Sequence, residues 1–354
     1  MQITRAVATP VELKLHRPVR MAGQAEIKSV HAIFIRLETR QGQNAWGCTI
    51  AHPTLTGTKI EDALRISRDC AVKIPDLHPL NIEQTLAELS PLAEKVPSVL
   101  CAFDLALHDL LGLAAGMPLY RLLGGFRNRI QTSITIPIAS LEESVETARA
   151  HARRGFRILK IKGGLDPEQD VRCVRAIHTA LPDHTLRLDA DGGYNERQAL
   201  EVARALKDMI EMIEQPTPAA DLVALRQVSK LSPVPVLADQ SAQGPESVLE
   251  IASGRCAQGL SVKLASCGGL RCARQVDSIA RAAGLFSMAG CLIEPAMLIA
   301  AGLSFALSSP NVRYGDLDGH LHLLDDPSQP GFVLKDGCLI AQDVPGLGYT
   351  MDLD

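Results

Sequence analysis

Short apolar runs, each ending near a charged side chain, recur through the middle of the chain. Five of them are FRILKIK, TLRLDA, MIEMIEQ, VPVLAD and LSVKLA, which reach Lys162, Asp189, Glu214, Asp239 and Lys263. From Asp189 onward the successive steps are 25, 25 and 24 residues. A step of that length accommodates one strand and one helix, so each charged residue marks the same place in a repeated β-α unit.

The same rhythm continues on both sides of these five runs. QTSITIPIA precedes them, LFSMAG and VRYGDLD follow them, and helix-length segments such as ERQALEVARALKDM separate them. One of the helices is marked by Ser140 and Glu143, which have the spacing of a capping box. Eight strands close a β/α barrel, whose strand carboxyl ends meet around one mouth. The pattern therefore predicts an α/β fold with a TIM-type barrel over residues 126–324.

Residues 1–125 follow a different order, with strands first and helices afterwards. ITRAVATPVELKL, SVHAIFIRLET and the segment after RQGQ alternate as strands do, whereas three later segments carry apolar residues at helical spacing. The last of these helices is expected to end at Gly116, before Pro118. We predict an α+β capping domain over residues 1–125. The polar tail of residues 325–354, rich in Pro and Gly, is expected to return to that domain.

Composition narrows the possible partners and the compartment. The net charge is −4 and aromatic residues make up 3% of the chain, which does not suit a nucleic-acid-binding surface. Nine cysteines without a C-x-x-C pair favour reduced thiols over a disulfide framework. Neither a signal-like apolar start nor a run of roughly 18 apolar residues is present. We expect a cytoplasmic protein that binds neither nucleic acid nor membrane.

The lysines at the strand ends indicate proton chemistry. Lys160 and Lys162 are two residues apart on one strand and therefore share a face. If that face lines the barrel, burial and mutual repulsion are expected to lower the pKa of both amines, which would make a base near neutral pH. Lys263 approaches from the opposite wall. Two amines on opposite sides of one carbon provide the geometry that racemisation or epimerisation requires.

The acids at three consecutive strand ends indicate a metal site. Taken singly, Asp189, Glu214 and Asp239 are each better explained as helix caps or ion-pair partners. Taken together, three hard oxygen ligands with space left for substrate suit Mg²⁺. A metal on a substrate carboxylate would stabilise the enediolate that forms when the α-proton is removed.

These motifs carry a resemblance that covers nearly the whole chain. The segment GMPLYRLLGG, the K-x-K pair, D-A-D, E-Q-P, D-Q-S and K-L-A-S-C-G-G are similar to motifs of the enolase superfamily, muconate-lactonising subgroup. Within that subgroup the chain most resembles the dipeptide epimerases. The resemblance implies Lys162 and Lys263 as acid/base catalysts, Lys160 beside the substrate carboxylate, and Mg²⁺ on the three acids.

The resemblance also implies a substrate class and its contacts. In dipeptide epimerases an Asp-x-Asp on the eighth strand binds the α-ammonium of the dipeptide, and here YGDLDGH supplies that pair. The implied substrate-binding residues are Asp316, Asp318, Thr135, Gln24 and Glu294. Relatives of this kind are often homo-oligomers, which is the expectation for this chain. A small-molecule dipeptide is the expected partner.

The chain also departs from the family pattern. Gln240 stands where many relatives have Glu, which is expected to ease deprotonation of Lys263, and Asp191 replaces a frequent Asn. Gln24 stands where Ala-Glu epimerases have Arg, which disfavours Ala-Glu as the best substrate. Activity as an N-acylamino acid racemase, o-succinylbenzoate synthase or cycloisomerase is the alternative. The non-enzymatic alternative is a paralogue that has lost catalysis and binds peptides.

Overall fold

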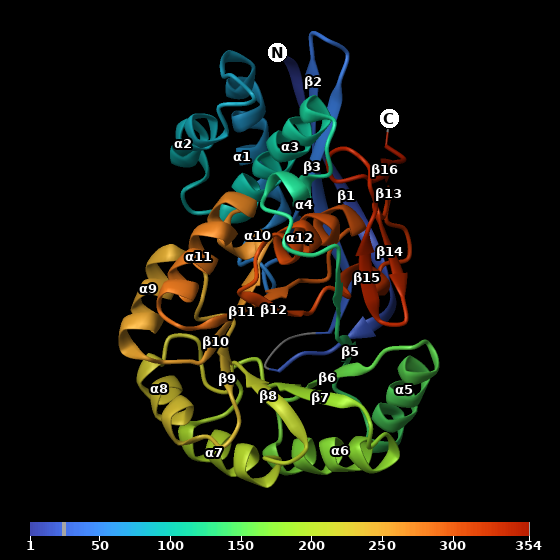
Figure 1. The fold of residues 1–354 in the computed structure, drawn as a ribbon, viewed down its shortest axis with the longest axis vertical. Coiled ribbons are helices and arrows are strands. Elements are labelled where there is room, and N and C mark those ends of the chain that lie inside the picture. The colour runs from blue at the N-terminus through green and yellow to red at the C-terminus, as the bar shows by residue number, and fades with distance from the viewer. Residues whose placement is uncertain (23–25, 354) are drawn as a thin grey trace.

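The N-terminal region combines a three-stranded sheet with three helices. The structure, a computed structural model, describes residues 1–22 and 26–353. The strands pair antiparallel in the order β1-β2-β3 and the helices pack beside them, at the top of Figure 1. The elements are β1 Ile3–Val19, β2 Ile27–Thr39, β3 Asn44–Ala51, α1 Ile60–Lys73, α2 Ile82–Ala93 and α3 Pro97–Ala115. The sequence pattern of strands followed by helices is confirmed.

Helix α3 is the core helix of this region. Its side chains Phe103 and Leu107 are fully buried, and β3 approaches so closely at Gly47 that a Cβ there would collide with the backbone of Ala102. The helix ends at Gly116, whose φ of 64° is left-handed, as predicted. Length and composition alone would allow α3 to cross a membrane, but 78% of its apolar window is buried inside the protein. That burial is typical of a core helix.

The second region is the predicted barrel. Eight strands follow one another as neighbours in the order β5 to β12, and each neighbouring pair is parallel. A parallel bridge between Thr132, just before β5, and Gly315, at the end of β12, joins the first strand to the last. The strands are β5 Ile134–Ile136, β6 Ile158–Lys162, β7 Thr185–Asp189, β8 Ile210–Glu214, β9 Val236–Ala238, β10 Gly259–Lys263, β11 Phe286–Gly290 and β12 Val312–Gly315.

Helices surround the strands, as the arc in the lower half of Figure 1 shows. They are α5 Leu141–Arg153, α6 Pro167–Ala180, α7 Glu196–Ala205, α8 Leu222–Leu231, α9 Pro245–Gly254, α10 Leu264–Cys267, α11 Leu270–Ala282 and α12 Ala296–Ser308. The capping box of Ser140 and Glu143 is present at the start of α5, with both reciprocal hydrogen bonds. Strand β10 ends at Lys263 and α10 begins at the next residue, so the predicted strand LSVKLA is two residues too long.

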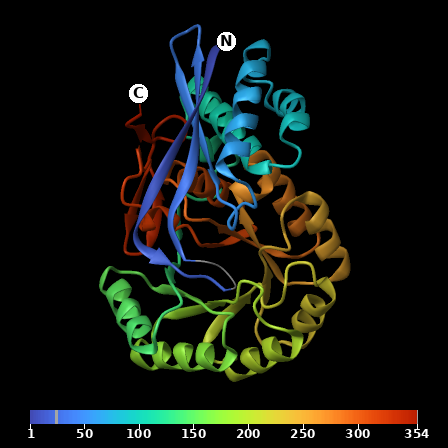
Figure 2. The ribbon, with the colours of Figure 1, turned by 180° about the vertical axis from the view of Figure 1, so that it is seen from behind.

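The C-terminal tail consists of short strands and loops that contact both regions. Strand β15 (Cys338–Ala341) pairs with β14 (Phe332–Lys335) and with β4 (Arg129–Gln131), and β13 (Ser328–Gln329) pairs with β16 (Thr350–Met351). Figure 2 shows this tail beside the N-terminal strands. Buried Asp109 on α3 accepts hydrogen bonds from the Leu347 backbone N–H at 2.8 Å and the Tyr349 hydroxyl at 2.6 Å. The segment that contains Leu347 and Tyr349 is thereby held against α3.

Candidate active site

A cavity lies at the carboxyl ends of the barrel strands. Its wall includes side chains from β6, β10 and the segments after β9, β11 and β12. Residues of the N-terminal region complete the rim, namely Val19, Met21, Thr54 and Leu55. Val19, Met21 and Leu55 add apolar surface beside the polar interior, and a less polar surrounding strengthens electrostatic interactions inside the cavity.

Three acids converge in the described part of the chain. Asp189 ends β7, Glu214 ends β8 and Asp239 follows β9, and one ligand oxygen of each lies within 4.8 Å of the others. All three are buried. Among residues 1–22 and 26–353, Glu214 Oε1 has no hydrogen-bond partner, although it is shielded from solvent. A buried, unpaired carboxylate oxygen beside two further carboxylates fits a hard divalent cation such as Mg²⁺.

The loop after β8 positions the third acid. Gln215 is fully buried, and its Oε1 accepts hydrogen bonds from the backbone N–H of Asp239 at 2.9 Å and of Ser241 at 3.1 Å. Its Nε2 donates to the Thr217 carbonyl at 2.9 Å. With all these bonds made, Gln215 holds the segment that carries Asp239 against the end of β8.

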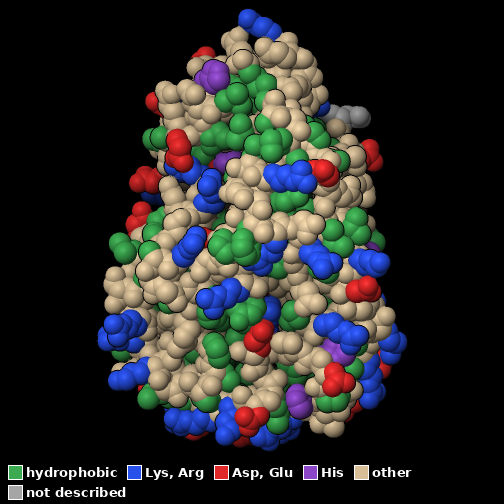
Figure 3. Space-filling model, viewed as in Figure 1, with side chains coloured by type: hydrophobic (Ala, Val, Ile, Leu, Met, Phe, Trp, Pro, Cys, Tyr) green, Lys and Arg blue, Asp and Glu red, His purple; other side chains and the backbone are tan. Residues whose placement is uncertain are grey.

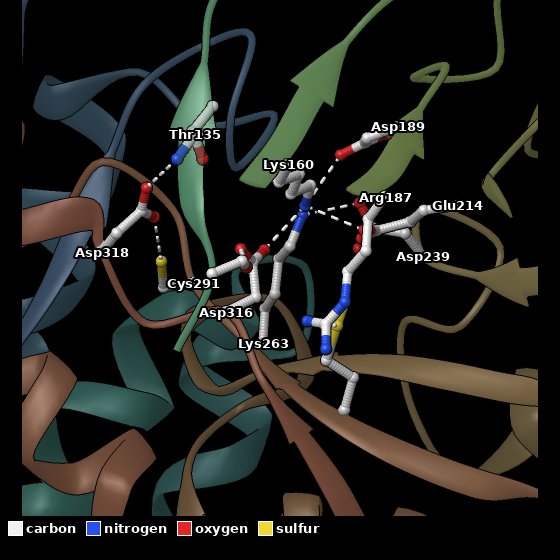
Figure 4. Close-up of polar contacts among 12 residues, drawn as sticks. Thr135, Lys160, Arg187, Asp189, Glu214, Asp239, Lys263, Cys291, Asp316 and Asp318 are labelled. Carbon is white, nitrogen blue, oxygen red and sulfur yellow. Dashed lines mark hydrogen bonds and ion pairs between the residues drawn. The ribbon is translucent and has the colours of Figure 1, made fainter. Parts of the chain in front are cut away.

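The three predicted lysines all line the cavity, and each contacts the acids. Figure 4 shows Lys160 and Lys263 among these acids. Lys160 Nζ lies 2.9 Å from Asp189, 2.8 Å from Glu214 and 2.7 Å from Asp316. Lys162 Nζ lies 2.9 Å from Asp189. Lys263 Nζ lies 2.6 Å from Asp239, on the far side of the cluster.

Strand order places Lys162 and Lys263 on opposite walls. Lys162 ends β6 and Lys263 ends β10, four strands away in a sheet of eight. Space for Lys263 depends on Gly290 at the end of β11, because a Cβ there would lie 3.2 Å from Lys263 Cγ and 2.6 Å from Ser261 Oγ. The smallest residue therefore stands where the Lys263 side chain crosses its neighbouring strand.

The predicted lowering of the lysine pKa values is wrong for these residues as they stand. Burial opposes the charge on Lys160, but the attraction of Asp189, Asp316 and Glu214 outweighs it and holds the pKa of Lys160 well above its ordinary value. The pKa values of Lys162 and Lys263 are raised for the same reason, with burial again opposing. The prediction took account of burial and of repulsion between the amines. In the fold, the attraction of the carboxylates around each amine is the larger effect on its pKa.

Asp191 and Gln240 form a pair on the Lys162 side of the cavity. Both Asp191 oxygens accept from Lys162 Nζ, at 2.8 and 2.9 Å. Gln240 Nε2 donates to Asp191 Oδ1 at 3.1 Å. The amide was expected to influence Lys263, but its hydrogen bond is to the acid that holds Lys162. Asp191 has a φ of 45°, a left-handed conformation that Asp tolerates.

Asp316 and Asp318 follow β12 and have different partners. Both are buried and line the cavity. Asp316 contacts Lys160 and accepts from the Ser133 hydroxyl at 2.5 Å. Asp318 Oδ2 accepts from the Thr135 backbone N–H at 2.6 Å, and its Oδ1 lies 3.7 Å from the Cys291 thiol. Asp318 therefore has no lysine partner among the described residues, unlike Asp316.

The remaining predicted contacts are placed as follows. Thr135 on β5 lines the cavity. Glu294 is buried, accepts from the Leu292 backbone N–H at 3.1 Å, and does not belong to the described cavity lining. Burial raises the pKa of Glu294 to about 8. Gln24 lies outside the described residues.

Sequence reasoning missed several residues of this cavity. Ser133 binds Asp316, and Cys291 and His322 lie beside Asp318, with His322 Nε2 4.0 Å from Asp318 Oδ2. Cys291 directly follows β11, so its place at a strand end was the available signal. His322 lies in the short helix η2 (Gly319–His322), whose fold onto the cavity had no sequence signal.

Comparison with known proteins agrees with this geometry. Residues 3–124 match the family model described as mandelate racemase / muconate lactonizing enzyme, N-terminal domain, and residues 143–354 match the model described as enolase C-terminal domain-like. The fold and site thus define an enzyme of the enolase superfamily. Within it, the chain belongs to the mandelate racemase / muconate lactonizing enzyme family.

Similar proteins include several epimerases. The chain is 36% identical over 343 residues to an L-Lys-D/L-Arg epimerase of Methylococcus capsulatus, with 95% of each chain covered. A dipeptide epimerase of Enterococcus faecalis V583, solved with Mg and L-Leu-L-Tyr, has a TM-score of 0.96 at 30% identity and covers 99% of this chain and 100% of its own. A dipeptide epimerase of M. capsulatus, solved with Mg and L-Arg-D-Lys, has a TM-score of 0.93 at 31% identity, with 99% and 100% covered.

Proposed function

We propose that this protein is a Mg²⁺-dependent dipeptide epimerase that inverts the α-carbon of the C-terminal residue of an L,L-dipeptide. The observation that carries the proposal is the placement of Lys162 and Lys263 on opposite walls of one cavity, with three converging acids between them. Relatives solved with Mg and a dipeptide support the same reaction class. An inversion needs a base on one face of the carbon and an acid on the other.

In this mechanism the two lysines exchange roles. The neutral amine of one lysine takes the α-proton from its own face. The ammonium of the other delivers a proton to the opposite face, and the reverse reaction uses them in the opposite order. Lys160 lies between the acid cluster and Asp316, where its charge offsets the negative charge that develops on the substrate carboxylate.

Asp189, Glu214 and Asp239 would hold Mg²⁺. Bound there, Mg²⁺ supplies electrostatic stabilisation to the carboxylate oxygens on which the enediolate charge accumulates. The unpaired Glu214 Oε1 and the excess of carboxylates over amines are the features of this chain that favour such a cation. The same carboxylates hold the lysines protonated in their present arrangement.

Asp318 favours a dipeptide over an N-acylated or cyclic acid. Its carboxylate is buried, lines the cavity and lacks a lysine partner among the described residues, so it is available for an α-ammonium group. An N-acylamino acid, an o-succinylbenzoate precursor or a cyclic acid would bring no positive charge to that carboxylate, whose described partners are the Thr135 N–H and, at 4.0 Å, His322. Burying a carboxylate that has no cationic amine or guanidinium beside it is costly, which disfavours those substrates.

The test is proton exchange in D₂O with Mg²⁺ and a panel of L,L-dipeptides, followed by NMR and chiral chromatography. We expect one deuterium at the C-terminal α-carbon together with formation of the L,D-epimer. Exchange only in N-acylated amino acids would favour the alternative, and exchange in no compound would support a non-catalytic paralogue.

The cellular setting is part of the same proposal. All nine cysteines are free, and six of them are buried, which suits a reducing compartment such as the cytoplasm. We also propose that the protein forms a homo-oligomer, because similar enzymes often do. Light scattering of the purified protein tests the assembly directly.

A further inference from the structure

A second cavity of about 330 Å³ lies directly beside the proposed active site. We call it the side cavity. It lies between the end of β1, strand β5, helix α5 and helix η2. Val19, Thr135 and His322 line both cavities, so the two share a wall. The part of a bound molecule that lies against Thr135 in the active site is therefore next to the side cavity.

The side cavity is basic, in contrast to the acid-rich site. Arg17, Arg154, His16, His151 and His322 line it, and its described lining contains neither Asp nor Glu. Burial, Arg154 and His322 lower the pKa of His151 to about 4, so His151 is neutral and the fixed charge comes from the two arginines. Figure 3 shows basic side chains over much of the lower half of the surface, including the part where α5 lies, with acidic and histidine side chains among them.

Neither arginine is neutralised within the described part of the chain. Arg17 and Arg154 form no ion pair there, whereas Arg153, one position earlier on the same segment, lies 2.8 Å from Glu146. Arg154 Nη1 makes a long contact of 3.5 Å with His151 Nδ1. Both arginines are exposed, and the Arg154 guanidinium lies 5.4 Å from the Phe156 ring, so two solvated cationic side chains line a cavity that adjoins a substrate site.

Asp318 connects the two cavities. Its Oδ2 accepts from the Thr135 backbone N–H at 2.6 Å and lies 4.0 Å from His322 Nε2, and both of these residues line the side cavity. An α-ammonium group bound to Asp318 therefore has the side cavity next to it. The side chain on that same α-carbon is the part of the substrate that extends toward the side cavity, whose lining includes the two arginines.

We infer that the side cavity binds an acidic side chain on the N-terminal residue of the substrate, so that the preferred substrates are dipeptides of the class L-Glu-L-Xaa or L-Asp-L-Xaa. Asp318 receives the ammonium group, and Arg17 and Arg154 receive the side-chain carboxylate. Opposite charges on neighbouring walls match the opposite charges of one acidic residue. This inference rests on the proposed function.

The experiment compares L-Glu-L-Ala with its neutral isostere L-Gln-L-Ala and with L-Lys-L-Ala, measured as kcat/KM for epimerisation. We expect L-Glu-L-Ala to be preferred over L-Gln-L-Ala by about tenfold, chiefly through KM, because partly solvated charge-assisted bonds contribute modestly. The preference should shrink as salt is added.

Variants assign the preference to the arginines. In the double variant Arg17→Gln/Arg154→Gln the ratio of the two kcat/KM values should fall to near one. Arg153→Gln, which removes the same charge one position away but outside the cavity lining, should keep the ratio of the unaltered enzyme. Circular dichroism and thermal unfolding confirm that each variant is folded.

The possible outcomes separate this inference from the proposed function. Equal use of the Glu and Gln dipeptides, preference for L-Lys-L-Ala, or a ratio that the double variant leaves unchanged would overturn the inference and leave the epimerase proposal standing. Exchange in no dipeptide at all would overturn both.

Discussion

Two clusters of charge occupy the same barrel, and they are built in opposite ways. We call the group around Arg187 the lower cluster and the group around Asp189 the upper cluster. At the lower one, Arg187 on β7 donates to Glu211 at 2.8 Å and to the Gly315 carbonyl at 3.1 Å, and its guanidinium stacks 5.0 Å from the Tyr314 ring. At the upper one, two residues further along β7, Asp189 joins a group in which carboxylates exceed amines. Within the described part of the chain, Glu214 Oε1 in this group has no hydrogen-bond partner.

The difference distinguishes a structural cluster from a functional one. A matched pair with its hydrogen bonds made leaves no charge uncompensated and needs no ligand to complete it. A cluster with surplus negative charge and an unpaired buried oxygen is unfavourable until a cation and a substrate complete it. Active sites are where such imbalance is expected in an otherwise consistent fold.

Loss of catalysis without loss of fold is the largest expected effect at the upper cluster. Lys263→Ala should lower epimerisation by about 10²- to 10⁴-fold, the usual contribution of a general acid or base. Exchange of the α-proton on the Lys162 face in D₂O should survive, since that amine is untouched. NMR measures the exchange and chiral chromatography the epimer. Epimerisation at the original rate would remove Lys263 from the mechanism.

The response to metal is the second way to separate the clusters. Mg²⁺ at 100 times its Kd should stabilise the unaltered protein by about 2.7 kcal/mol, because it binds only the folded state. Glu214→Gln should abolish this gain by removing one of the three ligands. Thermal unfolding with and without Mg²⁺ gives the comparison, with Glu211→Gln as the control in the lower cluster. Equal Mg²⁺ stabilisation of Glu214→Gln would contradict the assigned site.

The lower cluster should affect stability and leave the metal response intact. Glu211→Ala removes the partner of Arg187, whose side chain is 3% exposed, and leaves that charge uncompensated. Breaking a buried pair costs about 3–5 kcal/mol, and we expect about 2 kcal/mol here because Glu211 itself is 32% exposed. Urea unfolding measures the loss. An altered Mg²⁺ response in this variant would mean that the two clusters are coupled.

A third buried acid tests burial without an ion partner. Burial raises the pKa of Asp109 from 3.8 to about 6, against hydrogen bonds from Tyr349, Leu347 and Trp46 that lower it. A raised carboxyl pKa gives stability that is present below 3.8 and is lost as pH rises through about 6. Between about pH 5 and pH 7 the loss should be about 1 kcal/mol.

The control for that effect is Asp109→Asn, which cannot ionise. Its unfolding free energy should lack this fall between about pH 5 and pH 7, whatever its absolute stability. The same slope in both proteins would show that another group titrates. Either result leaves the two barrel clusters as they are, because Asp109 binds the tail through Leu347 and Tyr349.

The sequence alone determined the features that depend on local patterns. The even spacing of Asp189, Glu214 and Asp239 predicted the barrel, since parallel strands bring their carboxyl ends to one mouth. The capping box at Ser140 and the left-handed end at Gly116 also depend on neighbouring residues only. The family resemblance of the motifs led to the same superfamily that the family models show.

Only the tertiary structure decided how the charges act on one another. It gave each lysine its carboxylate partners and so raised pKa values that were expected to fall. It turned Gln240 toward Asp191, and it brought Arg17 and Arg154 into one cavity beside Asp318. Electrostatic energies depend on distance and burial in three dimensions, and the spacing of residues along the chain does not specify either.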